Sequence, residues 1–450
     1  MSGTPTGRRS LLDHPARYVV SGFVTVISVG TVLLLLPFAS APGASTSPLD
    51  AAFTATSAVC VTGLAVLDTG TYWTGFGQAV ILALIQVGGL GFMTIASLLV
   101  MLMSKRLGLR RQLVASTERG VLSLGDVRHV LSRLAVITLV VQLAVASLLT
   151  LRFWWGHDVG IGRATWSGVF HSISAFNNAG FSLYSDSLIG FSGDWMVLVP
   201  VAAAIVIGGL GFPVLVDLRR VEGNWRALTL HSKVTIAGSA ALLVLGFLLL
   251  TVLEWGNADT LGPMPVPQKL LDGGFASVTP RTAGFNSIDV AEMRPESLLA
   301  TIGLMFVGAG SAGTSGGIKV STFAILALVI WSQLRGESDV TGFQRRIPDS
   351  TQRQAITVAL LAVALVVSGT GVMLVSADVP LGDALFEAVS AFGTVGLSTG
   401  ITPDLPAADK LTLMVLMLVG RVGPITLGTA LVLRSHRSRF RLPEEGPLIG

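Results

Sequence analysis

One short pattern occurs four times in this chain, and it restricts the possible folds more than any other feature. Each copy is two residues, mostly small or polar, followed by a glycine and a large apolar residue: CVTGL, NNAGF, RTAGF and GTVGL, with the glycines at 63, 180, 284 and 396. A phenylalanine and a serine precede each glycine at offsets that agree to within one residue. A second glycine-containing landmark follows, at 88, 208, 308 and 420. Two landmarks at matched offsets indicate one module that is repeated four times.

The composition places these modules in a membrane. The 450 residues are 51% hydrophobic and 12% charged, whereas a usual soluble domain carries about 25% charge. The single cysteine, Cys60, excludes an intramolecular disulfide. Apolar runs of about 20 residues predict spanning helices. We find eight such runs, at Tyr18–Phe38, Gly75–Met103, Val130–Phe153, Trp195–Val216, Val234–Trp255, Leu298–Trp331, Ala355–Val375 and Leu411–Leu433.

A shorter run lies between the two long runs of each module and ends at the repeated pattern. These four runs, at 49–59, 165–176, 268–278 and 382–392, are too short to span, so we predict re-entrant helices. The C-terminal end of a helix carries partial negative charge, which favours a cation at each pattern.

We therefore predict an all-α membrane protein with four helix–pore helix–filter–helix modules, eight spans in all, around one pseudo-four-fold pore. Most of the 30 lysines and arginines lie in the tails and in the loops between modules, which places both termini in the cytoplasm. Arg8, Arg9 and the apolar run after them are similar to a secretory signal, but cleavage would remove a helix that the other three modules keep. The predicted division is a cytoplasmic tail at 1–17, modules at 18–104, 105–217, 218–333 and 334–433, and a second cytoplasmic tail at 434–450.

The repeated pattern suits the binding of a dehydrated cation. Backbone carbonyls can replace the water shell of an ion, and glycine allows the dihedral angles that turn those carbonyls inward. The four patterns contain no carboxylate, which favours a monovalent over a divalent cation. The alternative is that the glycines are ordinary small residues at helix contacts. The matched offsets and the polar neighbours argue against it.

Two features predict a gate. Residues 308–317, GAGSAGTSGG, interrupt the last helix of the third module, and Arg421 lies inside the final apolar run. Irregular backbone and charge at membrane depth must face protein or water. A kinked helix and a buried ion pair are the alternatives, and Lys319 could simply extend toward the cytoplasm. Pro213 predicts a kink in the last helix of the second module. Acids predicted on the outer side could attract cations: Asp50, Asp68, Asp186, Asp272, Asp383 and Glu387.

PRTAGFNS at 280–287 and GAGSAGTSGGIK at 308–319 are motifs in which the sequence resembles the superfamily of Trk, Ktr and HKT potassium transporters. The resemblance runs from about residue 18 to 433, and with eight spans it is closest to KtrB, the membrane subunit of bacterial Ktr systems. It implies that potassium is bound by filter residues Val61, Thr62, Gly63, Asn178, Ala179, Gly180, Thr282, Ala283, Gly284, Thr394, Val395 and Gly396. It implies a gate under the filter at Gly308, Gly310, Gly313, Thr314, Ser315, Gly316, Gly317 and Arg421.

The resemblance also implies partners. Ktr membrane subunits are homodimers in the bacterial plasma membrane, on a cytosolic ring of nucleotide-binding KtrA subunits. Sodium is expected to stimulate transport, and no organic cofactor is expected in this chain. The pI of about 9.6 reflects where the arginines lie and does not indicate nucleic-acid binding.

The predicted function is channel-like potassium uptake driven by the membrane potential. A Trk-type or sodium-permeable transporter with a different regulatory partner is the alternative within the superfamily. An alternating-access secondary transporter is an alternative of another class, although such proteins show inverted repeats and these modules all enter the same way. An intramembrane enzyme is not favoured, because the sequence shows no nucleophile or metal set within the spans.

Overall fold

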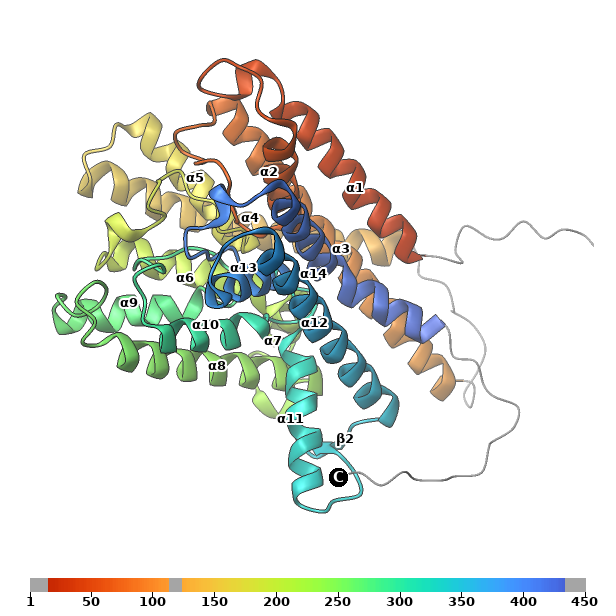
Figure 1. The fold of residues 1–450 in the computed structure, drawn as a ribbon. Helices are drawn as coiled ribbons and strands as arrows, with labels where there is room; N and C mark the ends of the chain where they lie inside the picture. Colours follow the sequence, from red (N-terminus) through yellow and green to blue (C-terminus); the bar gives the residue numbers. More distant parts are fainter. Residues whose placement is uncertain (1–14, 113–123, 434–450) are drawn as a thin grey trace, which may run out of the picture.

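The protein is almost entirely helical (Figure 1). The structure is a computed structural model that describes residues 15–112 and 124–433. The predicted tail at 434–450 and residues 1–14 of the other tail lie outside the described residues. Residues 15–17, predicted as tail, instead begin the first helix. A proline is tolerated there because the first helical N–H has no partner within the helix.

The helices follow the repeat. Those of the first two modules are α1 (Pro15–Leu34), α2 (Pro48–Cys60), α3 (Gly75–Gln112), α4 (Leu124–Gly156), α5 (Ile161–Asn177), α6 (Trp195–Leu210) and α7 (Phe212–Arg220). Those of the last two are α8 (Leu230–Glu254), α9 (Val266–Val278), α10 (Pro295–Phe306), α11 (Val320–Leu334), α12 (Asp349–Ser376), α13 (Leu381–Gly393) and α14 (Ala407–Leu433). Between α11 and α12 a small antiparallel hairpin pairs β1 (Thr341–Gly342) with β2 (Arg345–Arg346).

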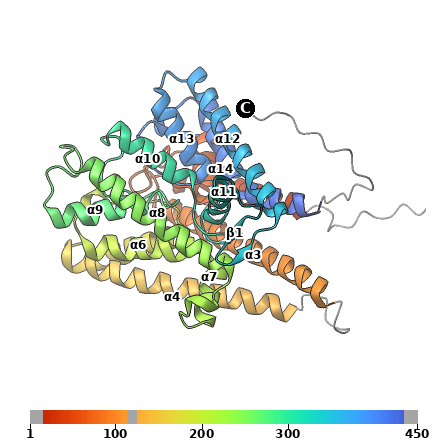
Figure 2. The same ribbon diagram turned by 90° about the horizontal axis from the view of Figure 1, so that it is seen from below.

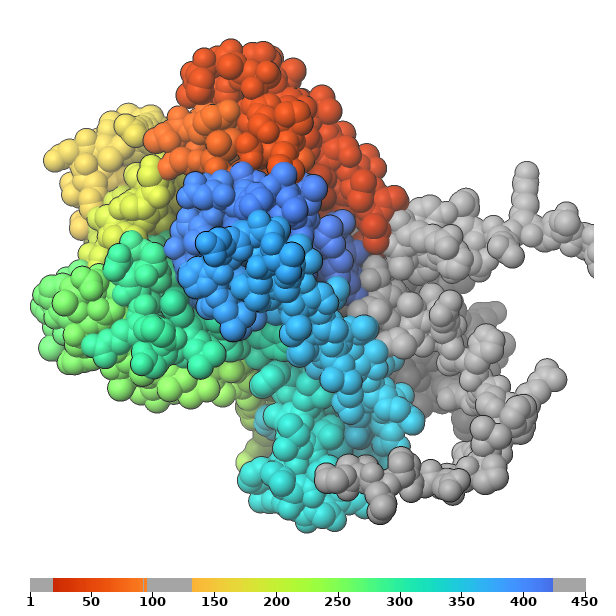
Figure 3. Space-filling model, in the orientation of Figure 1, coloured from red at the N-terminus to blue at the C-terminus, as the bar shows by residue number. Residues whose placement is uncertain are grey.

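Each module contains a short helix between longer ones, as the sequence predicts. These are α2, α5, α9 and α13, and each extends the predicted run by one to four residues at its N-terminal end. A short helix also packs against a long helix of the preceding module, in the pairs α3–α5, α6–α9, α10–α13 and α14–α2. The last pair joins the fourth module to the first, so the contacts close into a circle. Each quarter of the sequence accordingly forms one contiguous block (Figure 3).

Two of the long helices are broken. The axes of α6 and α7 meet at 92°, and the break is at Gly211, whose φ of 91° is in the region that favours glycine. The predicted kink at Pro213 is therefore misplaced, since Pro213 lies in the first turn of α7, where proline is favoured. The second break separates α10 from α11 at the glycine-rich segment. Seen from below, α4 lies along one edge of the molecule and α12 and α13 along the opposite one (Figure 2).

Several described helices are long and apolar enough to cross a membrane. They are Ser132–Gly156, Leu230–Glu254 and Asp349–Ser376, and the bent pair α6–α7 adds a fourth. Shorter apolar helices cover Val19–Leu34, Gly75–Gly91, Pro295–Phe306 and Val320–Leu334. The arrangement in eight spans stays a prediction.

Candidate functional site

The four repeated patterns share one backbone geometry. The residue two positions before each glycine has a positive φ, between 50° and 68°, in Val61, Asn178, Thr282 and Thr394. The glycines themselves have φ values of 96°, 72°, 74° and 92° at Gly63, Gly180, Gly284 and Gly396. Three of the residues two positions before a glycine are also left-handed C-caps of the short helices: Val61 caps α2, Asn178 caps α5 and Thr394 caps α13. The pattern therefore turns the chain in a similar way in all four modules, and it ends the short helix directly in three of them, whereas α9 ends at Val278 with Thr279 as its C-cap.

The four glycines form a closed ring. A Cβ atom added to each glycine would lie against the carbonyl oxygen of the residue that precedes the next glycine. The pairs follow the order of the chain and return to its start: Gly63 to Ala179, Gly180 to Ala283, Gly284 to Val395 and Gly396 to Thr62. All twelve predicted filter residues belong to the segments that make this ring. Because four short helices also end here, their C-terminal carbonyls add partial negative charge, and a cation is the ion that suits the ring.

The serine that recurs in the sequence supports the ring. The Oγ atoms of Ser57 and Ser390 accept hydrogen bonds from the N–H groups of Gly63 and Gly396, both at 3.1 Å. The hydroxyl of Ser174 donates to the carbonyl of Phe181 at 2.8 Å. The displaced serine of the third module, Ser277, instead donates to Leu243 of α8. A serine in the helix therefore holds the glycine turn in three modules, whereas the third module differs.

Two buried side chains that the sequence analysis did not assign to the site brace the segment after the glycine. Glu387 of α13 accepts hydrogen bonds from the hydroxyls of Ser398 and Thr402. His171 of α5 lies 3.0 Å from the Oγ atom of Ser182. Glu387 and His171 each stand nine positions before their ring glycine and are fully buried. Their shared offset was the signal that could have identified them.

A cavity of about 250 Å³, called the outer cavity after the predicted orientation, has all four ring glycines in its lining. Among its described lining residues Asp68 is the one acid. Burial raises the pKa of Asp68, but hydrogen bonds from Ser185, Thr71 and Gly70 outweigh it and hold the pKa below its usual value.

The acidic vestibule suggested by the sequence is wrong at two of its six positions. Asp272 and Glu387 are fully buried, and Asp50 pairs with Lys410 at 3.2 Å. The described residues also contain no group of three or more His, Cys, Asp or Glu side chains that could hold a metal ion. The carbonyl oxygens of the ring are the candidate ligands for a cation in this region.

The glycine-rich segment at 308–317 lies directly against the ring. A Cβ atom on Gly316 would meet the side chain of Thr394, and the hydroxyl of Thr314 donates to Asn178 at 3.0 Å. Both Thr394 and Asn178 stand two positions before a ring glycine. Except for Ser311, which is half-buried, the whole segment is buried. It therefore closes the space on the side of the ring away from the outer cavity.

Backbone bonds fix this segment to two other modules. The N–H groups of Gly310 and Thr314 donate to the carbonyls of Gly209 and Gly208 in α6, at 2.8 and 3.2 Å. The N–H group of Gly317 donates to Gly420 of α14 at 3.2 Å. The loop therefore forms hydrogen bonds with the second landmark of the repeat, at Gly208 and Gly420.

Arg421 is fully buried and joins the loop to the helices around it. Its guanidinium donates to the carbonyl of Thr314 and, at 3.3 Å, to the carbonyl of Gly88 in α3. Lys319 bonds within the loop, to the carbonyls of Ser315 and Gly316, and is buried rather than extended toward solvent. The predicted gate residues therefore come together beneath the ring.

The comparison with known proteins agrees with this arrangement. Residues 11–439 match the model of the TrkH family, described as cation transport protein. The chain belongs to the TrkH family. It is therefore a membrane protein of a transporter family, and the resemblance found in the sequence is confirmed.

Individual relatives cover nearly the whole chain. It is 38% identical to Ktr system potassium uptake protein B of Bacillus subtilis, over 96% of this chain and 95% of that protein. It is 36% identical to the protein of the same name from Vibrio alginolyticus (99% and 97% covered) and to the potassium/sodium uptake protein NtpJ of Enterococcus hirae (97% of each). The crystal structure of the potassium transporter TrkH from Vibrio parahaemolyticus aligns with a TM-score of 0.72 at 18% identity, over 95% of this chain and 86% of that one, and shows the same fold.

Proposed function

We propose that this protein takes up potassium ions through the glycine ring, by a channel-like path driven by the membrane potential. The closed cyclic order of the four glycines and the carbonyls between them carries the proposal. Relatives named as potassium uptake proteins over nearly the full length support it. The proposal places both termini in the cytoplasm and eight spans around one pore.

The proposed path is based on the positions of the cavity and the ring carbonyls. An ion enters the outer cavity, where Asp68 supplies negative charge, and loses water to the carbonyls of Thr62, Ala179, Ala283 and Val395. Potassium is favoured over sodium if the braced turns keep these oxygens too far apart for the smaller ion. The short helices lower the energy of the cation through their C-terminal ends.

Past the ring the ion meets the loop at 308–317, which we propose is the gate. Because the loop is buried and bonded to α6 and α14, it must shift before an ion passes. We propose that the protein is a homodimer and that a cytosolic nucleotide-binding ring of KtrA type drives this shift, with sodium as an activator.

The proposal is tested by uptake in a bacterium that lacks its own potassium uptake systems. The full chain is expressed with a cognate ring subunit, as wild type, as Gly63→Ser and as Gly91→Ser. A Cβ atom on Gly91 would meet nothing within 4 Å, so this variant is the matched control. Growth at low potassium with wild type and the control, and loss of selectivity over sodium with Gly63→Ser, are expected. Unchanged selectivity in Gly63→Ser would overturn the ring as the filter.

A sodium-permeable pore is the second candidate, because one relative is named for potassium and sodium uptake. Isotope flux into proteoliposomes with either ion separates the two. Comparable sodium and rubidium fluxes in wild type would favour this candidate, whereas a strong preference for rubidium supports potassium uptake.

A further inference from the structure

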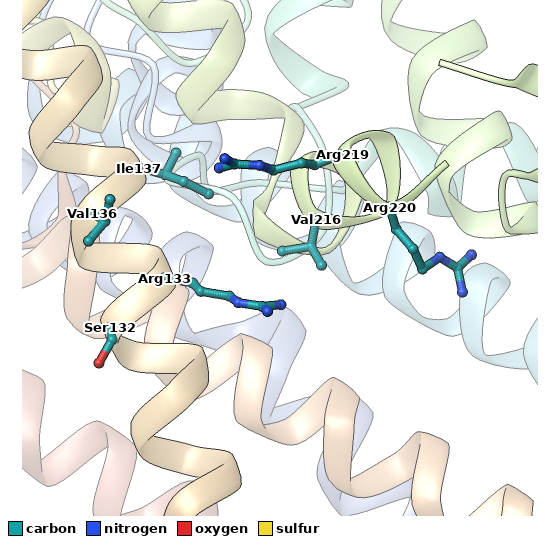
Figure 4. Close-up of a pocket in the computed structure, with 7 residues that line it drawn as sticks. All are labelled: Ser132, Arg133, Val136, Ile137, Val216, Arg219 and Arg220. Atoms are coloured by element: carbon teal, nitrogen blue, oxygen red, sulfur yellow. The ribbon is translucent and has the colours of Figure 1, made fainter. Parts of the chain in front are cut away.

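A second cavity lies away from the ring, in a cleft of about 630 Å³ between α4 and α7 (Figure 4). Its described lining residues are Ser132, Arg133, Val136, Ile137, Val216, Arg219 and Arg220. Arg133 belongs to α4 and Arg219 to α7, far apart in the chain, so the tertiary fold brings their charges together. None of these residues contributes to the ion path.

The charges of the described residues that line this cleft are unbalanced. The side chains of Arg133 and Arg219 reach into the same gap from opposite sides, whereas Arg220 points away (Figure 4). Asp217 is already bound by Arg220 at 2.6 Å and by the hydroxyls of Thr229 and Ser232. Within the described part of the chain, Arg133 and Arg219 make no ion pair or hydrogen bond of their side chains. Two guanidinium groups that enter one gap, with no acid among the described residues that line it, favour a bound anion.

The cleft lies at the end of a membrane span. Ser132 begins the apolar stretch of α4 that is long enough to cross a membrane, and Arg219 and Arg220 end α7, the second leg of the bent span. Arg133 and Arg219 therefore lie where a lipid headgroup would lie.

An apolar stripe continues from the cleft along α4. Val136, Leu139, Val140 and Leu143 follow the spacing of one helical face and are each more than half exposed. A stripe of this kind at membrane depth is solvated by acyl chains. The cleft thus offers cations for a phosphate and, adjoining them, an apolar path for a hydrocarbon chain.

We propose that this cleft binds an anionic phospholipid, with its phosphate between Arg133 and Arg219 and an acyl chain along the stripe of α4. Arginine is well suited to phosphate because its planar donors can bind two oxygens at once. Basic pockets between membrane helices are a known type of lipid headgroup site. A free phosphate would use the arginines alone and leave the stripe without a role.

The position of this site connects it to the proposed gate. α7 starts after Gly211, and the N–H group of Phe212, its first residue, donates to the loop carbonyl of Ala312 at 3.3 Å. A lipid held against α7 therefore acts on a helix whose other end contacts the loop. Such an effect rests on the proposed function, whereas lipid binding itself does not.

Binding is tested by native mass spectrometry of the purified full chain, titrated with dioleoyl phosphatidylglycerol or dioleoyl phosphatidylcholine. Wild type is expected to retain phosphatidylglycerol preferentially. The variant Arg133→Gln/Arg219→Gln is expected to lose this preference by about tenfold, which corresponds to roughly 1.4 kcal/mol. The matched control Arg226→Gln/Arg345→Gln removes the same charge from exposed positions and should behave as wild type.

Two further arms separate the sources of the phosphate and the parts of the site. Dihexanoyl phosphatidylglycerol, whose chains are short, should bind more weakly than the dioleoyl lipid, and Val140→Ser should reduce the difference. Equal retention of phosphatidylglycerol by wild type and the double variant would overturn the proposal. So would inorganic phosphate that displaces the lipid at equal concentration, since the site would then bind a soluble anion.

Discussion

The ring is formed by four equivalent segments, whereas the layer beneath it is formed by a single loop. Four modules supply the ring with equivalent residues in equivalent conformations, with φ positive at each glycine and two positions before it. The layer beneath is made by one loop, at 308–317, that the third module alone contributes, and it is held by α6, α14 and Arg421. A selective pore needs oxygens arranged evenly around an ion, which repetition provides. The gate proposed here needs a part that can move alone, and a single loop meets that need.

The third module shows how this difference arises. In the other three, a Cβ atom on the landmark glycine would meet the carbonyl four positions before the ring glycine: Gly88 meets Val59, Gly208 meets Phe176 and Gly420 meets Phe392. The equivalent Gly308 would instead meet Gly316 of its own loop. In three modules the long helix thus packs on the end of the short helix, whereas in the third the chain leaves the helix and fills the centre.

The largest expected effect breaks the equivalence of the ring. Alanine at each ring glycine, one at a time, should lower potassium uptake by roughly a hundredfold, about 2.7 kcal/mol in the transport barrier. A Cβ atom at each ring glycine would lie against the carbonyl oxygen of the neighbouring segment of the ring. The positive φ at each of these positions would also strain alanine. The measurement is rubidium uptake by proteoliposomes, with Gly91→Ala as control. A module whose glycine tolerates alanine would show that the four do not act equally.

The next effect is specific to the layer beneath. Arg421→Gln removes the guanidinium that joins Thr314 to α3, so rubidium leak without any cytosolic subunit should rise by about tenfold, or roughly 1.4 kcal/mol. Lys319→Gln is the comparison, since Lys319 donates to the loop carbonyls of Ser315 and Gly316, and it should raise the leak less. A leak that stays at the wild-type level in Arg421→Gln would remove this residue from the gate. The unfolding temperature of both variants shows whether they remain folded.

A moderate effect is expected from the braces behind the ring. Glu387→Gln keeps the shape of the side chain but replaces one acceptor of the bonds from Ser398 and Thr402 with a donor. The preference for rubidium over sodium should fall by about threefold to tenfold, up to roughly 1.4 kcal/mol. Asp383→Asn, on the same helix but partly exposed, serves as control. Identical selectivity in both variants would reduce Glu387 to a packing role.

Helix packing around the ring is tested by stability. Gly88→Ala places a methyl group against the carbonyl of Val59 and should lower the free energy of unfolding by about 1–3 kcal/mol. Gly91→Ala has open space and should change it little. Gly308→Ala should change the rubidium leak more than the free energy of unfolding, because a Cβ atom there would meet Gly316 of the proposed gate loop rather than the end of a short helix. The thermal unfolding midpoint in detergent measures the stabilities.

The smallest effect is expected at the outer cavity. Asp68→Asn should weaken the apparent potassium affinity by about twofold at low ionic strength, and the difference should vanish at high salt. Hydrogen bonds hold the pKa of Asp68 below its usual value. The carboxylate therefore stays ionised between about pH 8 and pH 5, a range that lies above the usual pKa of an aspartate. Its contribution should therefore be constant over that range. A titration of this contribution between those pH values would contradict the assignment.

The sequence by itself determined the parts whose signals are local. Apolar runs, the short helices and the glycine turns are set by residues near one another in the chain, so α2 and α13 lie within one residue of their predictions. The recurring Ser57 and Ser390 also marked real contacts, although their role as supports of the glycine turns came from the structure.

Only the tertiary structure decided which distant parts meet. The contact of α14 with α2 closes the circle, and Thr314 contacts Asn178 across 136 positions of the chain. The structure also shows that the bend of the second module is at Gly211 rather than Pro213, and that Asp272 and Glu387 are buried rather than exposed. A local pattern specifies backbone preferences and the side that is apolar. It does not specify which of several similar surfaces pack together, because that choice depends on how the whole set of helices fills the interior.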